Sequence, residues 1–168
     1  MMKKFFAIAL SALLVFSLAA CAGQTAGQPA KQDDPSDNAQ IANPFTDYET
    51  LEEAESAAGF TFAVPDAIAN SGISAYRVMT ADDGNMIEVC YENGADLRKA
   101  PGEADISGDF ETYAQQQTLT AGDHEALLKG TDDVVYLATW SANGYTYAVS
   151  IEEGLTAETM SDLIASIA

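Results

Sequence analysis

The sequence predicts an α+β fold: an antiparallel sheet of six to seven strands, with an N-terminal and a C-terminal helix packed on one face. Two patterns indicate it. Short runs rich in β-branched and aromatic residues recur between residues 59 and 151, and turn residues separate them. Segments with capping residues and helical spacing flank these runs, at 46–59 and 156–168. We therefore expect one domain with a single core over residues 43–168.

The segment 46–59 is expected to open the domain as a helix. Thr46 with Glu49, and again Thr50 with Glu53, have the spacing of a capping box. In that motif, residues three apart each bind the backbone N–H of the other with their side chains. The glycine that closes the segment is a natural helix stop, because it accepts the left-handed backbone conformation.

Short strands follow this helix. An Asp-Gly pair at 83–84 and an Asn-Gly pair at 143–144 supply residues that tolerate the positive φ of tight hairpin turns. The strands are expected at 59–65, 73–80, 85–92, 112–119, 124–129, 133–140 and 145–151, with a short additional one at 97–99.

The strand pattern is strongest in the hairpin formed by 133–140 and 145–151. Its second strand alternates, with one face formed by Tyr145, Tyr147, Val149 and Ile151 and the other by Thr146, Ala148 and Ser150. We expect this hairpin at the centre of the sheet, its aromatic face in the core and its other face open to solvent or lightly covered. The terminal helix above it has Thr156 as N-cap and an apolar stripe of Met160, Leu163, Ile164 and Ile167.

The start of the chain predicts export and a lipid anchor. Lys3 and Lys4 precede a short apolar run, which is typical of a signal peptide and too short for a membrane-spanning helix. The run ends in Leu-Ala-Ala-Cys at 18–21, which resembles the lipobox of bacterial lipoproteins. Residues 1–20 are then a lipoprotein signal peptide, and Cys21 carries acyl chains such as palmitate. The alternative is an ordinary signal peptide cleaved after Ala-x-Ala, with a cysteine nearby by chance.

Residues 21–42 are expected to be the lipidated cysteine and a disordered tether. The tether is made mostly of small and polar residues without a hydrophobic period, so it cannot bury enough apolar surface to become ordered. The domain that follows would be a monomer at the extracytoplasmic face of the cell membrane, held there through its N-terminal lipid anchor.

Charge narrows the choice of partners. The chain has 26 acidic and 7 basic residues and a formal net charge of −19. Such a field repels nucleic acid and anionic lipid headgroups, which argues against nucleic-acid binding. A cationic or protein partner in the cell envelope fits this charge, and solubility is the simpler explanation. Acidic pairs such as Asp82-Asp83 and Asp132-Asp133 lack the loop spacing of a calcium site, so we expect no metal and no cofactor.

Two residues with catalytic potential stand alone in the sequence. Cys90 has Glu88 and Glu92 on its face of the predicted strand, and these charges disfavour a thiolate. His124 lies in a predicted turn, and one histidine with one cysteine is too few for a tetrahedral zinc site. We expect an inert Cys90, an exposed His124 and no enzymatic activity.

Three aromatic residues, Trp140, Tyr136 and Tyr145, are the candidates for ligand contact if the domain has a binding face. Their alternation along the strands favours burial in the core instead.

The leading function is a non-enzymatic binding or sensory domain on a membrane-anchored lipoprotein. The alternatives are a carrier of a lipid or hydrophobic ligand, marked by an apolar cavity under the sheet, and a small envelope hydrolase, marked by a cleft with paired carboxylates.

The order of motifs is similar to that of a known family. The motifs are Glu-Glu-Ala-Glu in the first helix, Ala-Gly-Phe-Thr-Phe-Ala-Val-Pro at 58–65, Asp-Ile-Ser-Gly-Asp-Phe at 105–110, Leu-Lys-Gly at 128–130, Ala-Thr-Trp at 138–140 and Gly-Tyr-Thr-Tyr-Ala-Val-Ser at 144–150. They resemble a domain-of-unknown-function family of surface lipoproteins in anaerobic Gram-positive bacteria, which also occurs in anti-sigma-factor-like extracytoplasmic domains. The resemblance covers nearly all of 45–168 and implies an accessory or sensory domain without catalytic residues.

Overall fold

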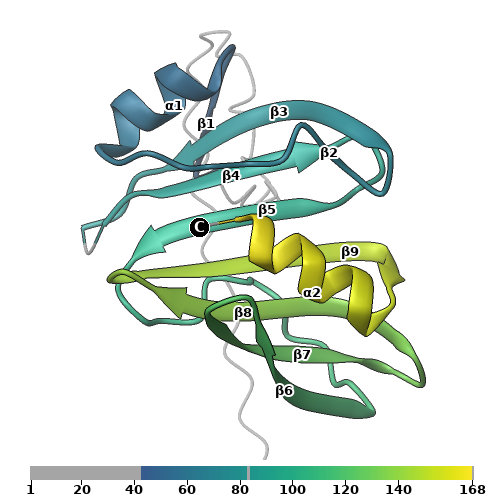
Figure 1. The fold of residues 1–168 in the computed structure, drawn as a ribbon. Coiled ribbons are helices and arrows are strands. Elements are labelled where there is room, and N and C mark those ends of the chain that lie inside the picture. The colour runs from purple at the N-terminus through teal and green to yellow at the C-terminus, as the bar shows by residue number, and fades with distance from the viewer. Residues whose placement is uncertain (1–42, 83, 168) are drawn as a thin grey trace, which may run out of the picture. The chain divides into compact units, whose positions relative to one another are not determined.

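An antiparallel sheet of nine strands dominates the computed structural model, which describes residues 43–82 and 84–167 (Figure 1). In chain order the elements are β1 (Phe45–Tyr48), α1 (Leu51–Ala58), β2 (Ala67–Ile68), β3 (Ser71–Met79), β4 (Met86–Tyr91), β5 (Asp96–Pro101), β6 (Gln115–Ala121), β7 (His124–Thr131), β8 (Val134–Ala142), β9 (Tyr145–Leu155) and α2 (Ala157–Ser166). The predicted signal peptide, Cys21 and the predicted tether lie outside the described residues.

The sheet has the strand order β1-β3-β4-β5-β9-β8-β7-β6, and β2 pairs with β3 beside this path. All of its strand pairs are antiparallel. The predicted antiparallel sheet with two helices is therefore confirmed, but six to seven strands was wrong. Two short strands that the sequence did not reveal, β1 and β2, account for the difference.

The N-terminal segment divides between a strand and a helix. Residues 46–48, expected to be helical, belong to β1 and pair with β3. The helix α1 begins one turn later, because its N-cap is Thr50 and not Thr46. The hydroxyl of Thr50 accepts a hydrogen bond from the N–H of Glu53 at 3.3 Å. The Glu53 carboxylate in turn accepts the N–H of Glu49 at 3.2 Å. Gly59 ends the helix at φ +89°, as expected.

The expected strand at 59–65 was also wrong. Backbone groups of this segment form hydrogen bonds with side chains instead of with a neighbouring strand. The N–H of Phe62 donates to the Glu55 carboxylate at 2.5 Å, and the carbonyl of Thr61 accepts from Lys99 at 2.6 Å. The apolar alternation in this segment still serves burial, since Phe62 is 2 % exposed. Alternating hydrophobicity thus identified a buried segment but not its hydrogen-bonding partner.

Both helices add side chains to one apolar core. Ala54 of α1 and Met160 and Ile164 of α2 belong to the same cluster of buried residues as Val149 and Tyr147 of β9. The predicted burial of the aromatic face of β9 is confirmed, and β9 lies next to β5 in the middle of the strand order. Neither α1 nor α2 is long and apolar enough to cross a membrane.

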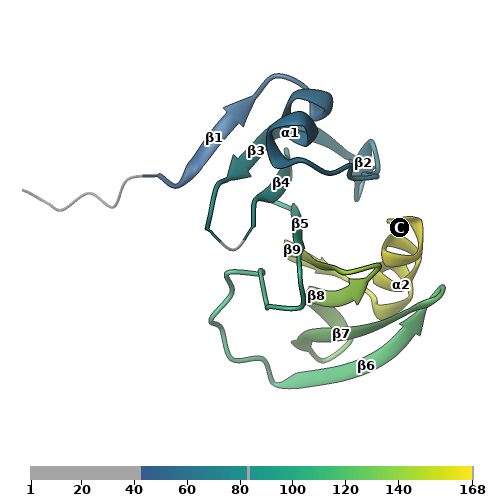
Figure 2. The same cartoon turned by 90° about the vertical axis from the view of Figure 1, so that its left-hand side faces the viewer.

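The other face of the sheet is covered as well. The segment 102–114, which joins β5 to β6, lies on the side away from α2 (Figure 2). Arg98 holds it by donating to the carbonyls of Ile106, at 3.1 Å, and Ser107. Thr146 and Ala148 are buried on this face, so the expectation that this face of β9 is open to solvent or lightly covered was wrong.

Candidate functional site

A buried carboxylate organises the face under the segment 102–114. Glu88, on β4, is 1 % exposed, and each of its oxygens meets a different arginine. Arg77 on β3 is 2.5 Å from one oxygen, and Arg98 on β5 is 2.6 Å from the other. The arginines are the direct cross-strand partners of Glu88 in the two registers. Once the strands were paired, the sequence could have revealed this cluster, because all three residues share one face.

Cys90 and Asp96 complete this cluster, but the cluster does not suit a metal or a nucleophile. The ligand atoms of Glu88, Cys90 and Asp96 lie within 4.8 Å of one another. The guanidinium of Arg77 already occupies the cation's position, because it donates to both Cys90 and Glu88 and lies 4.0 Å from Asp96. Burial, the hydrogen bond and charge of Asp96, and the charge of Glu88 raise the pKa of the Cys90 thiol to about 12. A protonated thiol is neither a nucleophile nor a metal ligand.

His124 lies far from this cluster. It begins β7, whereas Cys90 lies on β4, and three strands, β5, β9 and β8, separate them in the sheet. At the usual spacing of neighbouring strands, four steps amount to roughly 19 Å. The two residues therefore form no catalytic pair.

Beside the cluster, a surface hollow of about 310 Å³ combines carboxylates with aromatic rings; we call it the acidic hollow. It is lined by Gly94, Asp96, Asp109, Tyr113, Tyr136, Ser150, Ile151 and Glu152. These residues come from the β4–β5 turn, β5, the segment 102–114, β8 and β9, so the fold brings together parts of the chain that are far apart in the sequence.

The aromatic wall of the acidic hollow is held in place. The rings of Tyr113 and Tyr136 stack, with centroids 6.3 Å apart and an angle of 25° between the planes. The Tyr113 hydroxyl donates to the Asp109 carboxylate. Burial, together with that hydrogen bond and charge, raises the pKa of Tyr113 to about 12, so this phenol stays a donor at neutral pH. The hydrogen bond from Tyr113 therefore holds the Asp109 carboxylate beside the aromatic wall.

The carboxyl group of Asp96, on β5, has a different environment from the other carboxylates of the hollow. Burial raises the pKa of Asp96, and the nearby charge of Glu88 adds to this effect, while Cys90, Arg98 and Arg77 oppose it. Glu152, in contrast, is exposed at the rim, close to Gly94. The hollow thus places the partly desolvated carboxyl group of Asp96 beside the exposed carboxylate of Glu152.

The structure separates the three predicted ligand-contact residues. Trp140 is 3 % exposed and stacks on Tyr147 in the core, with ring centroids 5.1 Å apart. Tyr145 packs against Phe60 at 5.2 Å. Of the three, Tyr136 alone lines the acidic hollow, and no sequence pattern indicated its partner Tyr113.

Tyr145 also takes part in an aromatic cage around a lysine. The ammonium of Lys99 lies 4.3 Å from the ring centre of Tyr145 and 5.3 to 5.6 Å from those of Phe60, Phe62 and Tyr147. Lys99 is 8 % exposed, and burial lowers the pKa of its amine although Glu55 opposes the shift. This cage is filled by the chain itself, so it offers no room to an external cation.

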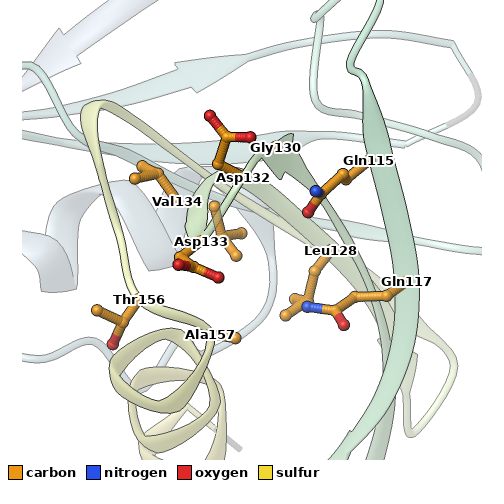
Figure 3. Close-up of a pocket in the computed structure, with 10 residues that line it drawn as sticks. Gln115, Gln117, Leu128, Gly130, Asp132, Asp133, Val134, Thr156 and Ala157 are labelled. Carbon is orange, nitrogen blue, oxygen red and sulfur yellow. The ribbon is translucent and has the colours of Figure 1, made fainter.

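A second hollow, of about 420 Å³, lies between β6, the β7–β8 turn and the start of α2 (Figure 3). Figure 3 shows Gln117 extending from β6 into this space, with Asp133 and Ala157 across from it. Leu128 and two valines, Val134 and Val135, supply apolar lining. Its lining has no aromatic side chain for stacking, and its polar contacts come from glutamine amides, aspartate carboxylates and Thr156.

Comparison with known proteins adds no assignment: no protein-family model, no curated protein and no solved structure matches this chain. The similarity to surface lipoproteins and anti-sigma-factor-like domains stays a prediction. The fold and the acidic hollow define an acidic α+β domain with one antiparallel sheet and a concave site of carboxylates and tyrosines.

Proposed function

We propose that this chain is a membrane-anchored extracytoplasmic lipoprotein whose domain binds a ligand without transforming it. The anchoring part rests on the sequence: two lysines, a short apolar run and Leu-Ala-Ala-Cys ending at Cys21. Two or three acyl chains on one cysteine hold a protein at a membrane far more firmly than one chain does.

The binding part is carried by the acidic hollow. Stacked tyrosines beside carboxylates form a concave surface that offers both apolar contact and charge, which is the usual composition of a binding site. The residues with the greatest catalytic potential, Cys90 and His124, are separated in the sheet, and the Cys90 thiol is protonated. These observations favour binding over chemistry.

The carrier alternative has less support, because large side chains fill the interior under the helices. Phe62, Leu97, Leu128 and Met160 are each at most 2 % exposed and belong to one continuous cluster. A lipid-sized ligand would have to displace them.

A small hydrolase is the second candidate, favoured by one observation. The acidic hollow holds Asp96, whose pKa is raised, together with Asp109. A pair of carboxyl groups in different environments is what general acid and base catalysis requires. Glycan and ester hydrolysis by the purified protein tests it: activity that Asp109→Asn abolishes, while binding is retained, would replace the binding function with this one.

Membrane fractionation tests the anchor. Cys21→Ala removes the acylated thiol, so the protein should leave the membrane fraction and lose the gel mobility of the lipidated form. Cys90→Ala is the matched control, because it removes the other cysteine, and should leave both properties unchanged. A Cys21→Ala protein that stays in the membrane with unchanged mobility would contradict the lipoprotein assignment.

A further inference from the structure

We infer that the acidic hollow and the neighbouring Phe110 form one docking surface for a basic segment of a protein, with a lysine or arginine side chain entering the hollow and an apolar side chain against Phe110. The inference rests on the proposed binding function and names the partner's chemistry.

Phe110 is the first observation. It is 97 % exposed and is the large hydrophobic residue that the described part of the chain leaves in solvent. Its backbone lies between Asp109 and Tyr113, which both line the acidic hollow, so the ring projects from the edge of the hollow although it is not part of the lining. A fully exposed phenylalanine gains nothing in the free domain, and aromatic anchors of this kind dominate protein interfaces.

The backbone around Phe110 is held in position before any partner arrives. Asp105 accepts the N–H of Ser107 at 2.9 Å, and Asp109 accepts the N–H of Glu111 at 2.7 Å, on either side of the ring. Arg98 binds two carbonyls of the same segment from beneath. Less conformational entropy is therefore lost when a partner binds Phe110 than would be lost from a flexible loop.

The charge of the surface is the second, independent observation. The four basic side chains of residues 43–82 and 84–167 all have partners within the domain: Arg77 and Arg98 bind Glu88, Lys99 is caged, and Lys129 lies 3.9 Å from Asp105. Asp96 therefore has Arg77 at 4.0 Å, whereas Asp109 and Glu152 have no basic partner among the described residues. A cation over the Tyr113 and Tyr136 rings gains from both the carboxylates and the π faces.

These features select a protein segment over other cations and surfaces. An anionic membrane or a nucleic acid is repelled by the same carboxylates. A small polyamine has no apolar side chain that could pack against Phe110. A segment that alternates basic and apolar residues satisfies the hollow and the ring together.

Titration calorimetry on the full-length lipoprotein in neutral detergent tests the inference. The probes are a synthetic peptide of alternating lysine and leucine, the same peptide with glutamate for lysine, spermidine, and a neutral chitin oligosaccharide. We expect the lysine peptide alone to bind tightly. Glu152→Gln should weaken its binding roughly fivefold and Phe110→Ser roughly tenfold, since each removes one contact of the surface.

Asp162→Asn is the matched control, because it removes an exposed carboxylate on α2, away from the segment 102–114. It should change the peptide's affinity less than twofold. Equal losses for Asp162→Asn and Glu152→Gln would reduce the effect to net charge and overturn the inference. Spermidine binding as tightly as the peptide, with no effect of Phe110→Ser, would also overturn it in favour of a small-cation site.

The remaining outcomes separate this inference from the proposed function. Binding of the oligosaccharide or of the glutamate peptide in the hollow, with none of the lysine peptide, overturns the basic partner and leaves a binding domain. Binding of none of the four probes, by a protein whose circular dichroism shows it folded, contradicts both the partner and the hollow as a binding site.

Discussion

The two faces of the same sheet are buried by different means. On β4, Ile87 and Val89 face the helices and are fully buried in hydrocarbon, whereas Glu88 and Cys90 face the segment 102–114 and are also buried. On the first face regular helices cover apolar side chains. On the second an irregular segment covers ion pairs, and its attachment depends on Arg98. Burial therefore occurs on both faces, but for different physical reasons.

The difference has energetic consequences. Apolar burial contributes about 25 cal/mol per Å² and, unlike an ion pair, has no directional requirement. A buried ion pair contributes little net stability, because the desolvation of both charges offsets their attraction. The helix-covered face should therefore supply most of the stability, whereas the polar face should fix the position of the segment 102–114 and of the acidic hollow.

The largest expected effect tests the two faces on a single strand. Tyr147→Ala removes a ring packed on Trp140 and Phe62, so the free energy of unfolding should fall by about 2–4 kcal/mol. Thr146→Ala, on the opposite face, should lower it by about 1 kcal/mol, since Thr146 is buried but small. Urea unfolding measures both. A larger loss for Thr146→Ala than for Tyr147→Ala would mean that the face under the segment 102–114 contributes more to stability than the face under the helices.

An intermediate effect is expected from the buried carboxylate. Glu88→Gln removes the carboxylate that both guanidinium groups bind and leaves Arg77 only Asp96, at 4.0 Å, so stability should fall by about 2 kcal/mol. The cost stays below that of a fully buried pair because the side chains of Arg77 and Arg98 are 30 % and 19 % exposed and keep some hydration. Glu92→Gln, at an exposed position just beyond β4, is the control and should change little. A stabilised Glu88→Gln protein would show that this face works better without its charges.

The smallest effect depends on pH and tests how the segment 102–114 is held. Burial alone would raise the pKa of Asp105, but its hydrogen bonds from Ser107 and the charge of Lys129 outweigh this and hold the pKa below the usual 3.8. A depressed carboxyl pKa stabilises the fold above the unfolded value, and this contribution disappears as the pH falls through the folded value. The side chain is 56 % exposed, so solvent screening limits its effect to a few tenths of a kcal/mol.

Asp105→Asn should therefore lower the urea midpoint slightly at pH 7, and this difference should disappear as the pH falls through the lowered folded pKa of Asp105. Asp162→Asn, which removes an exposed carboxylate on α2, serves as the control at both pH values. A difference between wild type and Asp105→Asn that grows on acidification would contradict the assigned sign.

Sequence patterns located the elements whose partners are local. The Asp-Gly and Asn-Gly turns predicted the β3–β4 and β8–β9 hairpins, and the stripe of Met160 and Ile164 predicted α2, because turn geometry and helix periodicity are set by nearby residues. The helix was misplaced at 46–49 because two capping boxes were equally good. The choice between them is made by pairing with β3, some thirty residues away.

The binding surface was harder to predict for the same reason. Tyr136 was a candidate from its aromatic ring, but Tyr113, Asp96 and Glu152 reach the acidic hollow only through the pairing of β5 with β9 and the path of the segment 102–114. Neither the β5–β9 pairing nor the path of the segment 102–114 is indicated by a pattern of neighbouring residues. The alternation of β9 correctly indicated two faces, yet nothing in the sequence shows that an irregular segment would cover the second.

The caged lysine makes the domain a reporter of its own local opening. Acylating reagents attack neutral amines that water can reach. The segment carrying Phe60 and Phe62 shields the amine of Lys99 and binds it through the carbonyl of Thr61, so the amine should become reachable when this segment lifts away. The rate at which Lys99 is labelled, divided by that of a free lysine amine, therefore gives the population of the lifted state. Residues 43–168 contain one other lysine, Lys129, so a single mass-spectrometric peptide follows the motion of this edge of the core without any engineered probe.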